Sequence, residues 1–201
     1  MKTIDFKGEL KHLYNPPTSR GVIVDVPRLQ FLMIDGAGDP NTSPDYQDAV
    51  QALYSVAYAA KFTLKATVSY SVPPLEGLWW ADDMTQFSVT NKGLWKWTMM
   101  IMQPEDLTEE LFRGVLGQVV RKKPLPALDR MRLESLHEGL SAQIMHIGPY
   151  AAEGPTMERL HGFIREGGYA FRGKHHEIYL SDPRRAAPEK MRTVLRQPVA
   201  T

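Results

Sequence analysis

Two short segments carry the residues best suited to chemistry, one in each half of the chain. In the first, Glu76 comes shortly before Trp79 and Trp80, and in the second Glu177 precedes Tyr179. Aromatic faces attract planar and cationic molecules, and a carboxylate beside them adds charge complementarity. A glutamate in a water-poor aromatic pocket can also act as a base. The residue types therefore predict a site for a small aromatic ligand.

The second segment, residues 175–179, is typical of a strand with two unlike faces. Because neighbours in a strand point to opposite sides, His175, Glu177 and Tyr179 share one face, and His176 and Ile178 share the other. A face of histidine, glutamate and tyrosine is unusual in a core strand, since a lone buried carboxylate is costly. The alternative is an edge strand whose polar face lies in water, which is common in antiparallel sheets.

The first segment is open to two interpretations as well. In a regular strand only one of Trp79 and Trp80 can line a given pocket. Aromatic residues usually serve packing, so both tryptophans could equally belong to the core or to the packed surface.

Other catalytic chemistries have weaker support in the sequence. His146, His175 and His176 are metal-ligand types, but no pair has the helical spacing of a metalloprotease motif. The serines have no glycine-flanked elbow. The segment 36–38 lacks a third glycine or a lysine in phosphate-binding register. We therefore expect neither a metal nor another cofactor.

Composition narrows the class of protein. The 201 residues include 24 lysines and arginines and 23 aspartates and glutamates. Because these charges nearly balance, the protein has little long-range electrostatic field to attract nucleic acid. The chain has no cysteine, which excludes disulfides and thiolate nucleophiles. No apolar run approaches the ~20 residues that span a bilayer, and Asp5 lies where a signal peptide is apolar. We expect a soluble cytoplasmic protein with no direct nucleic-acid or membrane partner, and its oligomeric state stays open.

Turn signals and apolar periodicity divide the chain into an arm and two similar halves. The arm covers 1–20, a first module with an extra helix covers 21–123, and a second module covers 124–201. Apolar spacing and capping predict helices over 44–61, 108–122 and 155–165. Alternating or continuous apolar runs predict strands over 29–34, 67–72, 94–102, 143–148, 175–180 and 190–196. A turn is expected over 35–41.

The two halves repeat one another, which predicts the fold. Strand 143–148 runs into Gly148-Pro149 much as strand 29–34 runs into Gly36, and Glu76 has the same place in its half as Glu177 in the other. We expect an α+β fold made by tandem duplication of a strand–helix–strand–strand module. Its antiparallel sheets would form a central ligand cleft about a pseudo-twofold axis, since sites between domains suit small ligands.

Five ordered motifs give the chain a resemblance to the GyrI-like small-molecule-binding family, and most closely to a branch without a DNA-binding domain. They are Ile34–Asn41, Ala52–Tyr58, Pro74–Trp80, Met145–Tyr150 and His175–Arg184. The resemblance implies two strand–helix–strand–strand modules around a ligand cleft. Relatives include ligand domains of multidrug-sensing activators, and stand-alone members that hydrolyse the cyclopropane ring of cyclopropyl-pyrroloindole toxins.

The resemblance also implies roles for particular residues. Glu177 would be the base that activates a water molecule, and Tyr150 or Tyr179 would hydrogen-bond the ligand oxygen where charge develops. The predicted ligand-binding residues are Tyr54, Glu76, Trp79, Trp80, Trp97 and His146. Two alternatives use the same sequence. One is a module that sequesters a drug or metabolite without turnover, and the other is an interaction protein that blocks an enzyme, which near-neutral charge disfavours.

Overall fold

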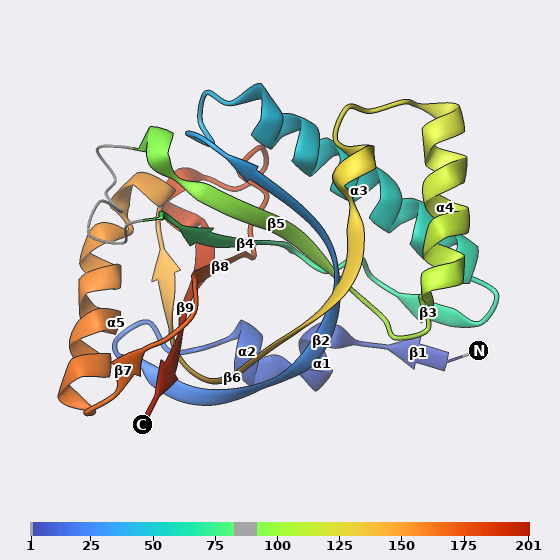
Figure 1. Ribbon diagram of the computed structural model, residues 1–201. Helices are drawn as coiled ribbons and strands as arrows, with labels where there is room; N and C mark the ends of the chain where they lie inside the picture. Colours follow the sequence, from blue (N-terminus) through green and yellow to red (C-terminus); the bar gives the residue numbers. More distant parts are fainter. Residues whose placement is uncertain (1, 83–91) are drawn as a thin grey trace. The chain divides into compact units, whose positions relative to one another are not determined.

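Antiparallel strand pairing organises the chain, for which a computed structural model describes residues 2–82 and 92–201 (Figure 1). Residue 1 of the predicted arm and residues 83–91 of the predicted first module lie outside the described residues. The main sheet contains β2 (Val22–Ala37), β4 (Leu75–Trp80), β5 (Lys96–Gln103), β6 (Arg132–Ile147), β7 (Ala170–Phe171), β8 (His175–Tyr179) and β9 (Arg192–Ala200). Hydrogen bonding orders these strands β6-β2-β5-β4-β8-β9-β7, with a further pairing of β6 with β9. The predicted α+β class with an antiparallel sheet is confirmed.

The chain divides into two units that are not consecutive in sequence. Unit 1 consists of Met1–Glu9, Leu29–Pro73 and Trp79–Leu136, and unit 2 of Leu10–Arg28, Pro74–Leu78 and His137–Thr201. The strands β2, β4 and β6 each pass from one unit into the other. The predicted modules, 21–123 and 124–201, stay a prediction.

The helices follow the sequence signals closely. They are α1 (Phe6–Glu9), α2 (Lys11–Tyr14), α3 (Pro44–Leu64), α4 (Glu109–Lys122) and α5 (Gly154–Glu166), with short 3-10 turns η2 (Lys92–Leu94), η3 (Leu128–Arg130), η4 (Tyr150–Ala152) and η5 (Pro188–Lys190). Pro44 begins α3 at a position where its missing N–H costs nothing. The Thr108 hydroxyl caps α4 by accepting a hydrogen bond from the Leu111 N–H. None of the described helices is long and apolar enough to cross a bilayer.

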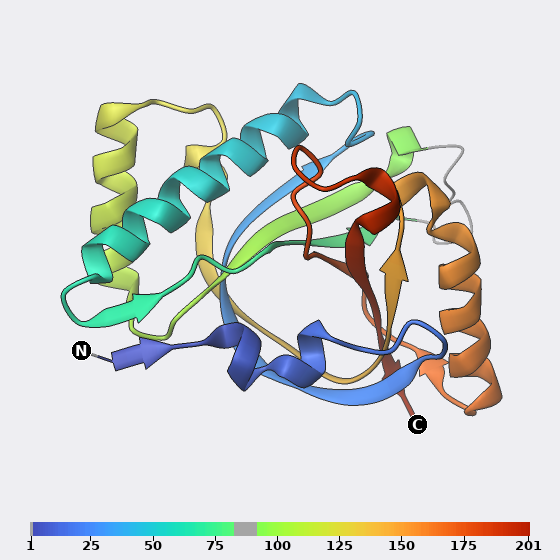
Figure 2. The ribbon, with the colours of Figure 1, turned by 180° about the vertical axis from the view of Figure 1, so that it is seen from behind.

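Unit 1 is built on the pairing of β2 with β5. Their antiparallel register places Phe31 opposite Met102 and Gly36 opposite Trp97. A Cβ atom on Gly36 would lie 2.1 Å from the Trp97 ring, so only glycine fits beneath this tryptophan. The helix α3 packs on β5 and α4 and leads into β3 (Val68–Tyr70) (Figure 2).

Unit 2 is built on β9, which pairs antiparallel with β6, β7 and β8. The helix α5 runs along β7 and β9 (Figure 1). A fully buried apolar cluster between helix and sheet consists of Ala142, Ile144, Leu160, Ile164, Leu195 and Val199. Burying each large side chain of this kind stabilises the fold by about 1.5–3 kcal/mol.

Several expected boundaries differ from the structure. The strands β2 and β6 each extend over 16 residues, because they begin well before the apolar runs that predicted them, at Val22 and Arg132. Residues 35–37 belong to β2 instead of the expected turn, which begins at Gly38 with its φ of 100°. The strand expected from residue 94 begins at Lys96, since Leu94 ends η2. The strand expected over 67–72 pairs in parallel with β1 (Lys2–Ile4) in a separate two-stranded sheet.

Candidate functional site

One face of β8 carries a glutamate held by two side chains of its own strand. The Glu177 Oε1 atom lies 3.3 Å from His175 Nε2, and Oε2 accepts a hydrogen bond of 2.8 Å from the Tyr179 hydroxyl. The strand period of two therefore brings the three predicted face-mates into contact. The Glu177 side chain is 15% exposed, so its carboxylate lies at the edge of the protein interior. A carboxylate has about four acceptor positions, so it can still accept from a water molecule or a ligand.

The turn after β6 places Tyr150 against this face. The rings of Tyr150 and Tyr179 meet edge to face with centroids 5.5 Å apart. Tyr150 is 39% exposed and begins η4. We call His175, Glu177, Tyr179 and Tyr150 the Glu177 site.

His146 holds the turn that carries Tyr150. Its Nε2 atom lies 3.2 Å from the Pro149 carbonyl, and its Nδ1 atom lies 3.0 Å from the Thr156 hydroxyl on α5. Because a carbonyl only accepts, Nε2 carries the proton and Nδ1 accepts from Thr156. Gly148 lets the chain turn here, since its φ is 136° and a Cβ atom would lie 3.2 Å from His146 Nε2.

His175 has one ring nitrogen in an unusual environment. Nδ1 is buried and has no hydrogen-bond partner within the part of the chain that the structure describes. His161 of α5 is close enough that the His175 charge helps, after burial, to lower the pKa of His161. The other ring nitrogen, Nε2, faces the Glu177 carboxylate, which is the acidic partner of His175 in this group.

The opposite face of β8 carries a buried ionic cluster. His176 is fully buried, with Nε2 2.9 Å from Glu76 Oε2 and Nδ1 3.0 Å from Glu138 Oε1. Arg196 of β9 donates from Nη1 to Glu138 Oε2 over 2.9 Å. All four side chains are at most 5% exposed. We call Glu76, Glu138, His176 and Arg196 the buried quartet.

The charges of the buried quartet stabilise one another. Burial alone disfavours the imidazolium, but the Glu138 and Glu76 carboxylates outweigh it and raise the pKa of His176 to about 9. Burial likewise opposes the Glu138 carboxylate, but His176 and Arg196 lower the pKa of Glu138 to about 2. His176 is therefore an imidazolium and Glu138 a carboxylate at neutral pH.

The N-terminal arm closes this cluster. Tyr14 ends α2 and hydrogen-bonds to Glu76, and burial followed by the Glu76 charge raises the pKa of the Tyr14 hydroxyl. Arg196 also donates to the Leu13 carbonyl and to Gln143 Oε1. The arm is thus an integral part of unit 2 from Leu10 onward.

The aromatic residues of unit 1 that were predicted to bind the ligand fall into two groups, one buried and one partly exposed. Trp79 is buried and stacks on Tyr46, with centroids 6.1 Å apart, and Trp97 is fully buried with its ring against the same tyrosine at 5.4 Å. Tyr54 and Trp80 are only partly buried. Since β4 is a regular strand at this point, Trp79 and Trp80 point to opposite faces, as expected.

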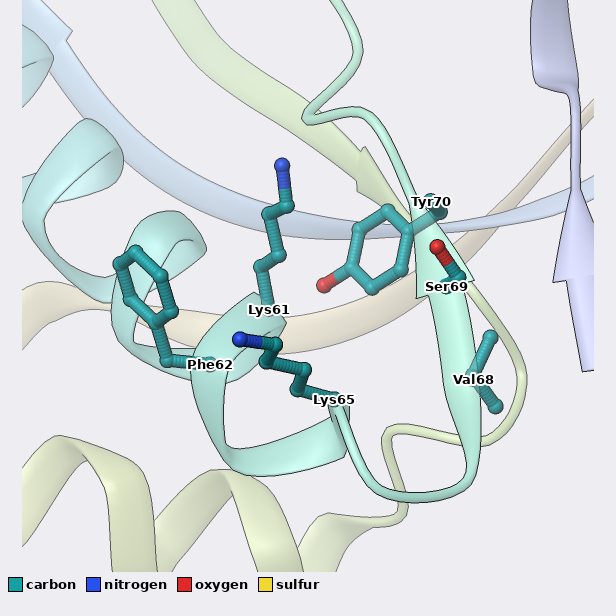
Figure 3. A pocket seen from close by; sticks show the side chains of 6 residues that line it. All are labelled: Lys61, Phe62, Lys65, Val68, Ser69 and Tyr70. Atoms are coloured by element: carbon teal, nitrogen blue, oxygen red, sulfur yellow. The ribbon is translucent and has the colours of Figure 1, made fainter. Parts of the chain in front are cut away.

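A separate open pocket of about 260 Å³ lies in unit 1 (Figure 3). It is lined by Lys61, Phe62, Lys65, Val68, Ser69 and Tyr70. None of these six residues was predicted for the site. Over residues 2–82 and 92–201 there is also no group of three or more acidic or histidine side chains arranged to hold a metal ion.

Comparison with known proteins identifies the family. The GyrI-like small molecule binding domain matches residues 22–200. The chain belongs to the GyrI-like small-molecule-binding family. No curated protein matches it.

Solved structures share the fold of this GyrI-like chain. An uncharacterized conserved protein from Listeria innocua is 40% identical, with a TM-score of 0.92, over 98% of this chain and 100% of that one. A hydrolase from Listeria innocua is also 40% identical, with a TM-score of 0.88, over 99% of this chain and 100% of that one. The C-terminal domain of EcmrR shares the fold at 10% identity, with a TM-score of 0.57, over 90% of this chain and 98% of that domain.

In this GyrI-like chain the structure joins some predicted site residues and separates others. Glu177, Tyr179 and Tyr150 form one group, and Glu76 lies in the buried quartet. His146 contacts Pro149 and Thr156 with its two nitrogens. Sequence reasoning did not single out His176, Glu138, Arg196 and Tyr14 as functional. For His176 a signal was present, because the strand period put it on the same face as the apolar Ile178, opposite Glu177.

Proposed function

We propose that the Glu177 site binds a planar aromatic molecule and hydrolyses a strained ring in it, with cyclopropyl-pyrroloindole compounds as the substrate class. The observation that carries the proposal is the Glu177 carboxylate, held by His175 and Tyr179 at the edge of the interior beside the exposed Tyr150 ring. The GyrI-like domain and the 40% identical hydrolase from Listeria innocua support it.

Each residue of the Glu177 site has a role in the proposed reaction. Glu177 accepts a proton from a water molecule while the water oxygen attacks the strained ring carbon. The carbon–carbon bond of the cyclopropane breaks, and its electron pair flows into the conjugated ring and onto the carbonyl oxygen. That oxygen takes up a proton and becomes a phenol, so the product is the substrate plus one water.

The two tyrosines divide the remaining work. The Tyr179 hydroxyl donates to Glu177 Oε2, so we assign it to orienting the base. Tyr150 is the more exposed of the pair, and we assign it to donating a hydrogen bond to the ligand oxygen where negative charge develops. His146 acts through the Pro149 carbonyl as a positioning residue for Tyr150.

A second candidate function is binding without turnover. Both Glu177 oxygens already meet side chains of the same strand, which suits a fixed negative charge that attracts a cationic ligand. Such a module would sequester a drug or metabolite and release it unchanged.

We also propose that the fold arose by tandem duplication, and that two aromatic residues of unit 1 contact the ligand. Tandem duplication is supported by two 16-residue strands, β2 and β6, that each lead through a positive-φ glycine into a helix. Each half also has a glutamine followed by proline, Gln103 near the end of β5 and Gln197 in β9. Gln103 donates to the carbonyl of the preceding Met102, and Gln197 donates to the carbonyl of the following Pro198. For unit 1 we retain Tyr54 and Trp80 as aromatic ligand contacts, and assign Trp79 and Trp97 to packing.

The test is product analysis by mass spectrometry after mixing the protein with a cyclopropyl-pyrroloindole compound. We expect a product heavier by one water, formed at least about 100-fold more slowly by Glu177→Gln, the usual scale of a general base. Glu166→Gln, at an exposed position at the end of α5, is the matched control and should keep the wild-type rate.

The outcomes separate the two functions. Wild-type turnover by Glu177→Gln would show that Glu177 is not the base. Tight binding with the ligand recovered unchanged would favour sequestration, and equilibrium dialysis measures that binding directly. Absence of both binding and turnover would refute this substrate class.

A further inference from the structure

We propose that the open pocket of unit 1 is a second binding site, for a small aromatic molecule that carries an anionic group. The pocket lies between the last turn of α3 and β3, and its lining combines two lysines with two aromatic rings (Figure 3). We call it the lysine pocket. Its cationic side chains contrast with the carboxylate of the Glu177 site, so the two sites select different ligands.

Lys61 and Lys65 give the lysine pocket its charge. They are four residues apart, and Lys65 keeps helical main-chain angles as the C-cap of α3, so both lie on one side of the helix. Among the residues that the structure describes, neither ammonium group has an ion pair or a hydrogen bond, and no carboxylate lines the pocket. Lys2 and Lys96, by contrast, each pair with an aspartate. The two charges of the lysine pocket are therefore available to an anion.

The end of α3 does not need these two ammonium groups as caps. A helix C-terminus carries about half a negative charge, which lysines often offset. Here the Phe62 carbonyl accepts from the Lys65 main-chain N–H, and the Leu64 carbonyl accepts from both the main-chain N–H and the hydroxyl of Thr67. Two full positive charges outweigh the helix end, so the local field favours an anion.

Phe62 and Tyr70 supply the aromatic walls of the lysine pocket. The Phe62 side chain is 67% exposed, so its ring has free surface for a ligand. Tyr70 is fixed, because its hydroxyl donates to Gln103 Oε1 over 3.3 Å and its ring meets Phe6 edge to face. Burial raises the pKa of Tyr70, so its hydroxyl, which points toward the two lysines in Figure 3, stays neutral and does not repel an anion. An aromatic ring can pack between these walls.

The volume of the lysine pocket limits the size of the ligand. It is about 260 Å³, whereas a cavity of about 150 Å³ holds benzene and drug-sized ligands take about 300–1,000 Å³. The pocket therefore suits one aromatic ring with one anionic group. Lysines are point charges without the planar fork of arginine, so they accept phosphate as readily as carboxylate. Two of them favour a doubly charged group, as in an aryl phosphate.

The experiment titrates the nitrogen-15-labelled protein with phenyl phosphate at about pH 7.5, where the phosphate is largely a dianion. Main-chain amide signals report where the compound binds. We expect saturable shifts at residues 61–70 and none at residues 175–179. The apparent affinity should fall with added salt, because exposed charges are screened.

Variants test each part of the lysine pocket. Lys61→Gln and Lys65→Gln should each weaken binding by about two- to fivefold, the usual scale of an exposed charge pair, and the double variant by about tenfold. Lys122→Gln, at the exposed end of α4 in the same unit, is the matched control and should bind as the wild type does. Phe62→Ala should weaken the binding of phenyl phosphate and leave that of inorganic phosphate unchanged.

Each alternative outcome contradicts the proposal in a recognisable way. Absence of saturable shifts at residues 61–70 overturns it. If the two lysines only stabilise the end of α3, their variants lower Tm but keep the wild-type affinity, which also overturns it. Equal affinity for inorganic phosphate and phenyl phosphate, or no effect of Phe62→Ala, means an adventitious ion only. Because phenyl phosphate has no strained ring, the result does not depend on the hydrolase proposal.

Discussion

The raised pKa of His176 in the buried quartet leads to a prediction of how the stability of the protein depends on pH. His176 has a folded-state pKa of about 9, raised from the ordinary value of 6.5 because its two carboxylate partners outweigh burial. A raised pKa means that the folded state binds the proton more tightly than the unfolded chain. The stabilisation is therefore complete below pH 6.5 and is lost as the pH rises from 6.5 to 9.

The size of the effect follows from the same two values. Each pH unit between them corresponds to about 1.4 kcal/mol, so the free energy of unfolding should fall by about 3 kcal/mol over this range. His176 is fully buried, so solvent screening does not reduce the figure. Because domains are typically stable by 5–15 kcal/mol, a loss of about 3 kcal/mol is easily measured.

Urea denaturation followed by circular dichroism at half-unit steps from pH 5 to 9.5 measures this dependence. His137→Gln is the matched control, because His137 is exposed beside Glu138 and should leave the slope unchanged. His161 does not mimic the effect, because burial lowers its pKa and its contribution is lost as the pH falls below 6.5.

A flat free energy of unfolding between pH 6.5 and 9 would refute the reasoning. So would a wild-type slope in a folded His176→Gln variant. Removing His176 leaves two buried carboxylates beside one guanidinium and can cost 3–5 kcal/mol. For that reason the ring nitrogens of His176 should also be titrated by nitrogen-15 NMR in the wild-type protein, where we expect a midpoint near 9.

Three glycine substitutions test the packing that positions the sites, each by thermal and urea unfolding. Gly36→Ala should destabilise unit 1 by about 3 kcal/mol or more, because the new Cβ would lie 2.1 Å from the buried Trp97 ring; a wild-type Tm would contradict that contact. Gly148→Ala should cost about 1–3 kcal/mol through its φ of 136° and its contact with His146, and should weaken ligand binding by displacing the turn before η4. Gly162→Ala, inside α5 with open space around it, should instead stabilise by up to about 1 kcal/mol, and a loss of stability there would argue against the helix.

The sequence could predict the elements whose signals are local. Pro44 and the apolar spacing located α3, and the Thr108 cap located α4 to within one residue. The period of two also placed His175, Glu177 and Tyr179 together, and the contacts of Glu177 with the other two agree with it. Burial alone does not separate the faces, because His175 is buried like His176 and Ile178, whereas Glu177 and Tyr179 are partly exposed. These features depend on neighbours along the chain, which a single sequence displays.

The polar part of β6 and the partners within the buried quartet could not be predicted, because they depend on pairing between segments that are distant in the sequence. The outer part of β6 is polar and reads as a loop, yet it is a strand and carries Glu138. His176 meets Glu76 across 100 residues and Arg196 meets Glu138 across 58, and no local pattern indicates such partners. Glu76 was singled out as an acid beside aromatic residues, but its carboxylate is turned to His176 because the strand order places β4 next to β8.

The chemistry of the buried quartet explains why stability alone is a poor account of it. Replacing a buried ion pair by apolar side chains of similar volume is often neutral or stabilising, because desolvation of the charges offsets most of their attraction. We therefore expect an apolar version of the quartet to keep the fold of unit 2. What an apolar version would lack is a fixed arrangement of charges directly behind Glu177. The two faces of this five-residue strand thus differ in kind: one holds Glu177 between His175 and Tyr179, and the other holds His176 between two buried carboxylates.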